Sequence, residues 1–103
     1  MKATPAVFYT LFAIASSKKE VNGYEIITFV RHFSTGKLRM TSSTVYPTLK
    51  KLKKRGLIHE VRRPMELRRK FYQLTSRGKK FLNTELGQLN KTLSLAYKAG
   101  LLP

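Results

Sequence analysis

Hydrophobic residues in the first third of the chain recur every three or four positions, which is the spacing of an α-helix. Residues 5–16 are predicted to form a first helix, with Pro5 near its start, where the missing N–H costs little. This segment is apolar nearly all round, because one stripe holds Phe8, Leu11, Phe12 and Ala15 and the other side holds Val7, Ala13 and Ile14. A helix of this kind is buried on two sides. We therefore expect Phe8 and Phe12 to face a second subunit.

A second helix is predicted from Asn22 to about Phe33. Asn22 and Glu25 have the spacing of a capping box, in which two side chains satisfy free backbone N–H groups at the start of a helix. Residues 16–21, before this helix, are predicted to form a polar turn, and Gly36 ends the helical region. The predicted inner face of the helix holds Ile26, Phe29, Val30 and Phe33.

The stretch from Thr41 to Gly56 predicts a third, amphipathic helix. Thr41 or Ser42 offers a hydroxyl for the N-cap, and Gly56 fits the left-handed position after the last turn. Pro47 lies beyond the first turn, where it removes one backbone hydrogen bond and is expected to bend the helix. The residues predicted to be buried form one narrow stripe of Val45, Leu49 and Leu52.

The remaining surface of this third helix combines short hydroxyls, one aromatic ring and several ammonium groups. Such a surface fits the major groove of DNA, where hydroxyls and aromatic rings reach base edges and lysines reach phosphates. The alternative is a surface helix whose lysines are simply solvated. The predicted DNA-binding residues are Thr41, Ser42, Ser43, Thr44, Tyr46, Lys50, Lys51 and Lys54. Among them Ser43, Thr44 and Tyr46 are expected to read bases, because they lie in the first turns.

Two short segments rich in β-forming residues, Leu57–Arg62 and Arg69–Leu74, predict a hairpin. Five cations surround it, and they are Arg62, Arg63, Arg68, Arg69 and Lys70. A charged edge that prevents aggregation is one interpretation. Contact with phosphates or the minor groove is favoured, because five cations exceed what edge protection needs. Helix, helix, basic helix and hairpin, in this order, indicate a mainly α-helical, winged helix-turn-helix fold.

A long last helix is predicted from Thr75 to about Ala99. Its apolar residues recur at spacings of four and three positions, which gives a narrow seam of coiled-coil type. This helix extends beyond what a body of about 75 residues can cover, so the seam is expected to form a dimer with a second copy. The alternative is packing against the chain's own core. The seam residues are Leu82, Leu86, Leu89, Leu93 and Tyr97.

Three segments resemble the PadR-like family of winged-helix regulators, and together they cover nearly half of the chain. Residues 43–58, STVYPTLKKLKKRGLI, are similar to the recognition helix of that family. Residues 22–26, NGYEI, resemble the start of its second helix, and residues 70–78, KFYQLTSRG, resemble its second wing strand and the opening of its last helix. Asn22 stands where the family has histidine, and the wing, 62–69, lacks the usual glycines. The resemblance implies a homodimer that binds double-stranded DNA and represses transcription.

The charge strengthens this interpretation. The 103 residues carry 21 Lys and Arg against 5 Asp and Glu, which gives a net charge of +16, and 13 of the basic residues lie between positions 50 and 80. A polyanionic partner is therefore expected. The chain has no cysteine, its two histidines are far apart, and no residues have catalytic or metal-ligand spacing. We expect no enzyme activity, no metal and no cofactor.

One domain is expected over residues 1–103, with a DNA-binding body at 5–74 and a dimerisation helix at 75–99. The chain shows no membrane-spanning stretch, and we expect a cytoplasmic protein associated with the nucleoid or a plasmid. The leading function is repression at a palindromic DNA site, with no effector ligand implied. One alternative keeps the fold but assigns it to a centromere-binding protein that oligomerises along DNA during plasmid or chromosome partition. Another is a basic RNA-binding or ribosomal protein, which the lack of stacking aromatics in the wing disfavours.

Overall fold

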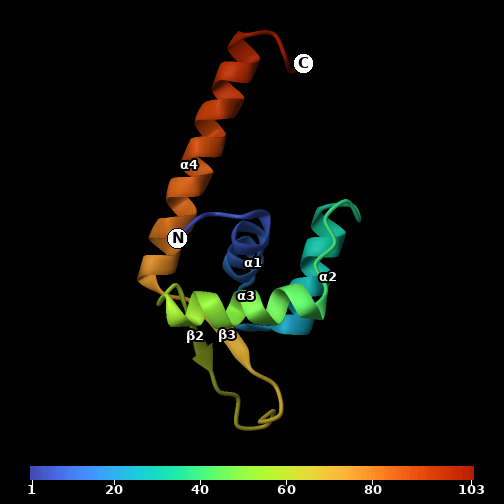
Figure 1. Cartoon of the computed structure of the whole chain (residues 1–103), viewed down its shortest axis with the longest axis vertical. Helices are drawn as coiled ribbons and strands as arrows, with labels where there is room; N and C mark the ends of the chain where they lie inside the picture. The colour runs from blue at the N-terminus through green and yellow to red at the C-terminus, as the bar shows by residue number, and fades with distance from the viewer.

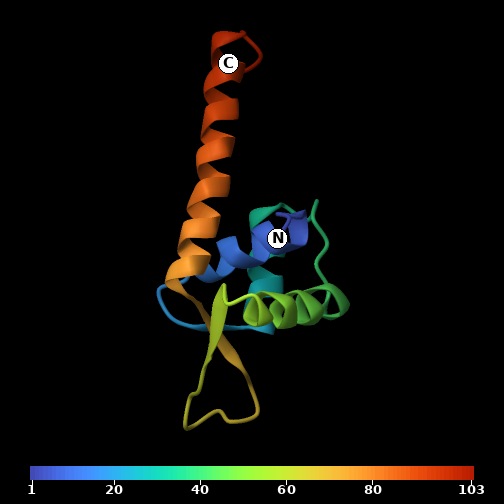
Figure 2. The same ribbon diagram turned by 60° about the vertical axis from the view of Figure 1, so that its left-hand side comes forward.

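The computed structural model describes residues 1–103, which form four helices and three short strands (Figure 1). In chain order these are α1 (Pro5–Ser16), β1 (Val21–Asn22), α2 (Gly23–Phe33), α3 (Ser42–Lys54), β2 (Ile58–Val61), β3 (Phe71–Leu74) and α4 (Ser76–Lys98). The first three helices form the body, α3 lies along one side of it, and the β2–β3 hairpin projects as a wing (Figures 1 and 2). The predicted fold class, mainly α-helical with a small hairpin after the third helix, is confirmed.

The sheet has one strand more than the sequence predicted. Strand order is β1-β3-β2, and β1 pairs antiparallel with β3, so that Val21 lies opposite Tyr72 and Asn22 opposite Phe71. The expected polar turn over 16–21 is therefore wrong at its last residue. A strand of two residues has no periodicity that a sequence pattern could reveal. Its effect is to make β3 the central strand and to join the wing to the start of α2.

Each body helix buries one stripe in a common core. In α1 the buried residues are Val7, Thr10, Leu11, Ala13 and Ile14, so the core receives the side of Val7, Ala13 and Ile14, while Phe8 and Phe12 are only partly buried. In α2 the core receives Ile26 and Val30, whereas Phe33 is 52% exposed and does not belong to the inner face. Phe8, Phe12, Phe29 and Phe33 instead pack on one another, with ring centroids 5.1–6.1 Å apart, at the outer side of α1 and α2.

The third helix begins and ends close to its predicted bounds. Thr41 is the N-cap residue, but its side chain makes no capping bond, because its hydroxyl is paired with that of Ser43 at 2.7 Å. The predicted hydroxyl cap is therefore wrong. At the other end Gly56 adopts φ +75°, and the N–H groups of Gly56 and Leu57 donate to the carbonyls of Lys53 and Leu52 at 3.1 and 3.0 Å. This pair of bonds is a Schellman motif, which requires a left-handed residue such as glycine.

The last helix starts against the body and then leaves it. Thr75 caps α4, since its hydroxyl accepts from the N–H of Gly78 at 3.0 Å. Leu82 is buried in the protomer's own core, which contradicts its assignment to a dimer seam. Beyond Leu86 nearly every residue of α4 is exposed, and the helix extends away from the body in the direction opposite to the wing (Figure 2).

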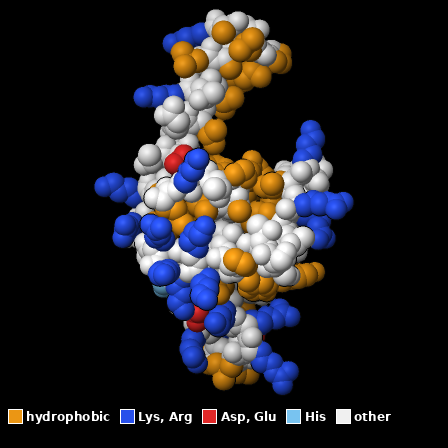
Figure 3. All heavy atoms as spheres, viewed as in Figure 1, with side chains coloured by type: hydrophobic (Ala, Val, Ile, Leu, Met, Phe, Trp, Pro, Cys, Tyr) orange, Lys and Arg blue, Asp and Glu red, His pale blue; other side chains and the backbone are white.

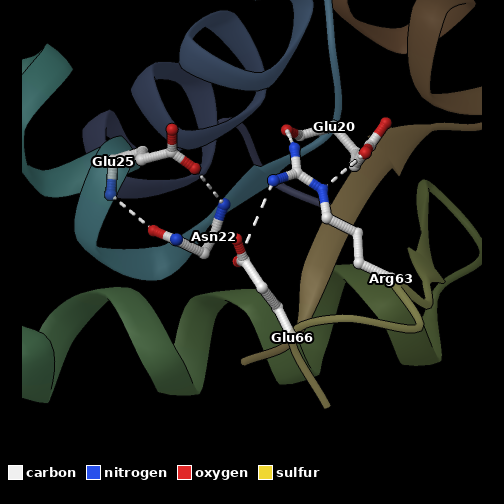
Figure 4. A network of polar contacts seen from close by, with 5 residues as sticks. All are labelled: Glu20, Asn22, Glu25, Arg63 and Glu66. Atoms are coloured by element: carbon white, nitrogen blue, oxygen red, sulfur yellow. Dashed lines mark hydrogen bonds and ion pairs between the residues drawn. The ribbon is translucent and has the colours of Figure 1, made fainter. Parts of the chain in front are cut away.

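One arginine fastens the wing to the body (Figure 4). The Nε of Arg63 donates to Oε1 of Glu20 at 2.7 Å, and its Nη2 donates to the Glu20 carbonyl at 3.2 Å. The guanidinium also lies 3.8 Å from the centroid of the Phe71 ring, within the range of a cation–π contact. A hydrogen bond from its own backbone and then the Arg63 guanidinium hold the pKa of Glu20 below its ordinary value. Arg63 therefore joins the wing to the turn between α1 and β1.

The two glycines inside α4 provide a matched test of how the helix packs. A Cβ at Gly78 would collide with the backbone carbonyl of Leu57, whereas nothing lies within 4 Å of a Cβ at Gly87. We expect Gly78→Ala to lower the free energy of unfolding by about 2 kcal/mol or more, because the clash outweighs the gain in helix propensity. Gly87→Ala should raise it by about 0.5–1 kcal/mol. Urea unfolding followed by circular dichroism would measure both, and equal effects would contradict the packing.

A second pair of variants tests the wing anchor. Arg63→Ala should lower the free energy of unfolding by about 1–2 kcal/mol, because it removes two hydrogen bonds and the interaction with Phe71. Arg69→Ala, on the same hairpin, should change it by less than about 0.5 kcal/mol, because Arg69 is exposed and no ion pair holds it. The comparison uses the same urea unfolding measurement. Similar losses in the two variants would show that Arg63 is not an anchor.

Candidate nucleic-acid interface

A groove separates the exposed face of α3 from the wing. It is an open pocket of about 860 Å³. Lys50 and Lys53 approach it from α3, and Arg68, Arg69 and Lys70 approach it from the wing. Figure 3 shows Lys and Arg side chains gathered over this region and around the wing. Two segments that are separate in sequence therefore bring their cations to one concave surface.

Burial of Val45, Leu49 and Leu52 fixes which side of α3 faces outward. Of the eight residues predicted to bind DNA, all are exposed except Thr44, which is partly buried. The helix continues through Pro47, and the neighbouring Thr48 hydroxyl donates to the Thr44 carbonyl at 2.7 Å. The outward residues are Thr41, Ser42, Ser43, Tyr46, Lys50, Lys51 and Lys54.

Tyr46 is held against the start of α2. A Cβ at Gly23 would lie only 2.7 Å from Cε1 of Tyr46, so the absence of a side chain at Gly23 makes room for the ring. The ring is nevertheless 51% exposed and lines the groove together with Tyr24 and Tyr72. Tyr46 therefore has a fixed body and an accessible edge, which is the arrangement that a residue contacting a ligand surface needs.

Glu60 is the one acid in the groove, and two lysines hold it. Its Oε1 accepts from Lys53 Nζ at 2.7 Å, and Lys70 Nζ lies 3.8 Å away. The hydrogen bond from Lys53 is the main reason why the pKa of Glu60 lies below its ordinary value. Burial, followed by the charge of Glu60, raises the pKa of the neighbouring Tyr72. Lys53 and Lys70 are thus partly neutralised within the chain, and the other cations of the groove are not.

The five wing cations predicted from the sequence do not have equivalent environments. Arg62, Arg68, Arg69 and Lys70 are exposed, but Arg63 turns back to Glu20 and Phe71. The contacts of Arg63 favour a structural role over the predicted contact with DNA. Sequence reasoning had no signal for this difference, because Glu20 is 43 residues away.

Sequence reasoning also missed three residues of the groove. Tyr24 is exposed at the first turn of α2, and Lys53 and Glu60, which also line the groove, form an ion pair. The spacing of Asn22 and Glu25 could have located Tyr24, since their capping box is present, with bonds of 3.0 and 2.8 Å (Figure 4). A capping box fixes where a helix starts, so the pattern places Tyr24 in the first turn of α2.

The residues predicted to form a dimer interface divide into three groups. Leu82 is buried in the core, and Leu86, Phe8 and Phe12 are partly buried around it. Leu89, Leu93 and Tyr97 are at least 50% exposed on the free half of α4. Figure 3 shows hydrophobic side chains along the side of α4 that faces the body, where further hydrophobic surface lies open.

The side chains that line the groove suit the binding of an anion. No group of three or more His, Asp or Glu residues lies together in a way that could hold a metal ion. None of the four helices combines the length and the hydropathy needed to cross a membrane. What the surface offers is an array of ammonium and guanidinium groups around hydroxyls and tyrosines.

Comparison with known proteins agrees with this arrangement. A sequence model described as "Transcriptional regulator PadR-like family" matches residues 11–84. Bacillus subtilis PadR, solved in complex with operator DNA, is 28% identical with a TM-score of 0.67, and the match covers 81% of this chain but 47% of that protein. A PadR family transcription regulator from Clostridium difficile is 21% identical with a TM-score of 0.72, over 92% and 97% of the two chains. No curated protein matches the sequence.

A transcriptional regulator from Clostridium thermocellum, 20% identical with a TM-score of 0.74 over 90% of this chain and 87% of that one, has the same fold. The family match covers the second half of α1, α2, α3 and the wing, and so includes every element that lines the groove. Its members are regulators of transcription, so the expectation that this chain is not an enzyme is confirmed. With residues 11–84 matched, the chain belongs to the PadR-like family of transcriptional regulators.

Proposed function

We propose that this regulator binds double-stranded DNA with α3 in the major groove and the wing on the adjacent backbone. The groove between α3 and the wing carries the proposal, because cations from both elements border it while one narrow stripe of α3 is buried. Phosphates would pair with Lys50, Lys51 and Lys54 on the helix and with Arg62, Arg68 and Arg69 on the wing. The structure of Bacillus subtilis PadR with operator DNA supports the same kind of partner.

Base reading is proposed for Ser43, Thr44 and Tyr46. They lie in the first turns of α3, which is the end that helix-turn-helix proteins present to base edges. The Ser43 hydroxyl shares one hydrogen bond with Thr41, but a hydroxyl has one donor and two acceptor positions and retains capacity for a base. Tyr46 is already held by Gly23, so that binding to DNA costs it little conformational entropy.

A homodimer is proposed as the active form. An isolated helix half that is exposed on all sides is marginal in water, and the Leu89, Leu93 and Tyr97 side chains need a partner. A second copy provides one, because its α1 and α2 offer the open aromatic cluster of Phe8, Phe12, Phe29 and Phe33. Two α3 helices related by a two-fold axis would contact half-sites about 34 Å apart, one turn of a palindromic site.

This assignment implies repression by occupancy of a promoter, in the cytoplasm, where the chromosome or a plasmid lies. It also divides the chain into a DNA-binding body at 5–74 and a dimerisation helix at 75–99. No observation favours the partition or RNA-binding alternatives. The family to which the chain belongs is defined by transcriptional regulation.

The proposed base readers can be separated from the phosphate-binding cations by two variants. Ser43→Ala with Thr44→Ala should leave binding to random duplex unchanged, while costing roughly 1–3 kcal/mol on the preferred palindrome for each base that is no longer read. Arg69→Ala should weaken all duplexes about equally and reduce the slope of log K against log salt by roughly one. Fluorescence anisotropy on a palindrome selected from random DNA would measure both. An undiminished preference in the double variant would assign base reading to another face.

The dimer prediction rests on one face of α4. Leu89→Glu should yield a monomer, because it places a charge in the middle of the proposed seam. Leu95→Glu is the matched control, since Leu95 is also exposed but lies on a different side of the helix. Sedimentation velocity at micromolar concentration would show whether each variant is a monomer or a dimer. A wild-type protein that sediments as a monomer would refute the dimer.

A further inference from the structure

The tip of the wing exposes two large hydrophobic side chains. Met65 is 93% exposed and Leu67 is 72% exposed, and neither contributes to the core of the protein. Figure 3 shows this hydrophobic cap at the end of the wing farthest from α4, with Lys and Arg side chains on either side. Apolar side chains at the end of a charged hairpin gain nothing from folding and indicate a contact with another molecule.

The tip is held in a defined shape although it has no glycine. The N–H of Glu66 donates to the Arg63 carbonyl at 3.0 Å, and the N–H of Arg69 donates to the Glu66 carbonyl at 3.2 Å. These bonds close two consecutive four-residue turns, and Pro64 occupies the second position of the first turn, which proline favours. No residue of the wing adopts a positive φ. Because Arg63 also fixes the base of these turns, the backbone that carries the two apolar side chains is already in a defined shape before binding.

The charges around the tip specify the partner. Arg62, Arg68 and Arg69 are exposed beside it, and its one acid, Glu66, is drawn toward Arg63 at 3.9 Å. A partner must therefore have a polyanionic surface and an apolar interior within reach of a narrow hairpin. Duplex DNA has both, since proteins that bind its minor groove insert apolar residues between base steps and bend the duplex. The wing borders the same groove as the exposed face of α3, so one duplex could contact both.

We propose that the wing tip inserts Met65 and Leu67 into the minor groove, partly unstacks a base step and bends the DNA. This inference rests on the proposed function, which supplies the duplex. In this arrangement the wing arginines bind the DNA phosphates, while Met65 and Leu67 deform the base stack. The regulator would thereby favour sites with easily unstacked pyrimidine–purine steps beneath the wing.

Ring closure of a linear duplex measures the bend without knowledge of the preferred site. A random-sequence fragment of about 130 base pairs is shorter than the persistence length of roughly 150 base pairs, so it circularises slowly when ligated alone. With saturating full-length protein, we expect the rate of ring closure to rise about tenfold. Met65→Ser with Leu67→Ser should return that rate to near the protein-free value and leave the salt slope of binding unchanged, because no charge is removed.

Arg68→Ala is the matched control on the same hairpin. It should weaken binding and lower the salt slope, yet at saturation it should close rings as fast as the wild type. Both tip residues are exposed, so the double serine variant should melt like the wild type, which circular dichroism verifies. Met65→Leu, which keeps an apolar wedge, should retain ring closure.

Three outcomes discriminate among the possibilities. A double serine variant that still accelerates ring closure at saturation would overturn the wedge. So would a variant that bends DNA normally but no longer forms larger complexes on long fragments, since the tip would then contact a neighbouring copy of the protein. If the wild type fails to shift any duplex in a mobility assay, the proposed DNA binding itself fails, and this result is distinct from the other two.

Discussion

Burial of one narrow stripe of α3 is the constraint on which the surface of this protein depends. Val45, Leu49 and Leu52 are almost completely inaccessible, so the rotation of α3 about its own axis is fixed. Removing these three side chains from water stabilises the fold by roughly 1.5–3 kcal/mol each. Because the same rotation decides which residues face outward, the packing of the core also fixes which side chains of α3 are exposed toward the groove.

Most of the few acidic residues are held by contacts within the chain. Glu25 caps α2, Glu60 holds Lys53, and Glu20 holds Arg63. Four of the five acids therefore make local or bridging contacts, counting the longer pair of Glu66 with Arg63. The cations that remain without an acidic partner repel one another, and a polyanion relieves that repulsion. Residues 50–80 hold 13 of the 21 basic residues and two of the five acids, so this stretch carries most of the net charge of +16.

The order of elements and the exposed face of α3 could be predicted from the sequence, because helix period, caps and glycine stops are local signals. The predicted helix ends agree with the structure to within two residues at the four positions that carried a local signal, which are Pro5, Asn22, Gly56 and Thr75. Three of the failures have one cause. The two-residue strand β1, the inward turn of Arg63 and the burial of Leu82 are decided by partners far away in sequence, and periodicity carries no such information. The predicted capping bond of Thr41 is absent for a different reason, because the Thr41 hydroxyl pairs with the hydroxyl of Ser43 instead.

The hydrogen bond between Arg63 and Glu20 also couples the wing mechanically to the end of α1. Glu20 lies in the turn between α1 and β1, and α1 carries part of the aromatic cluster at the outer side of the body. A displacement of the wing would therefore reach the turn that follows α1 through the Arg63 guanidinium. It would also reach that turn through the pairing of β3 with β1. The wing is thus joined to the segment after α1 by two connections, the Arg63 side chain over Phe71 and the pairing of β3 with β1.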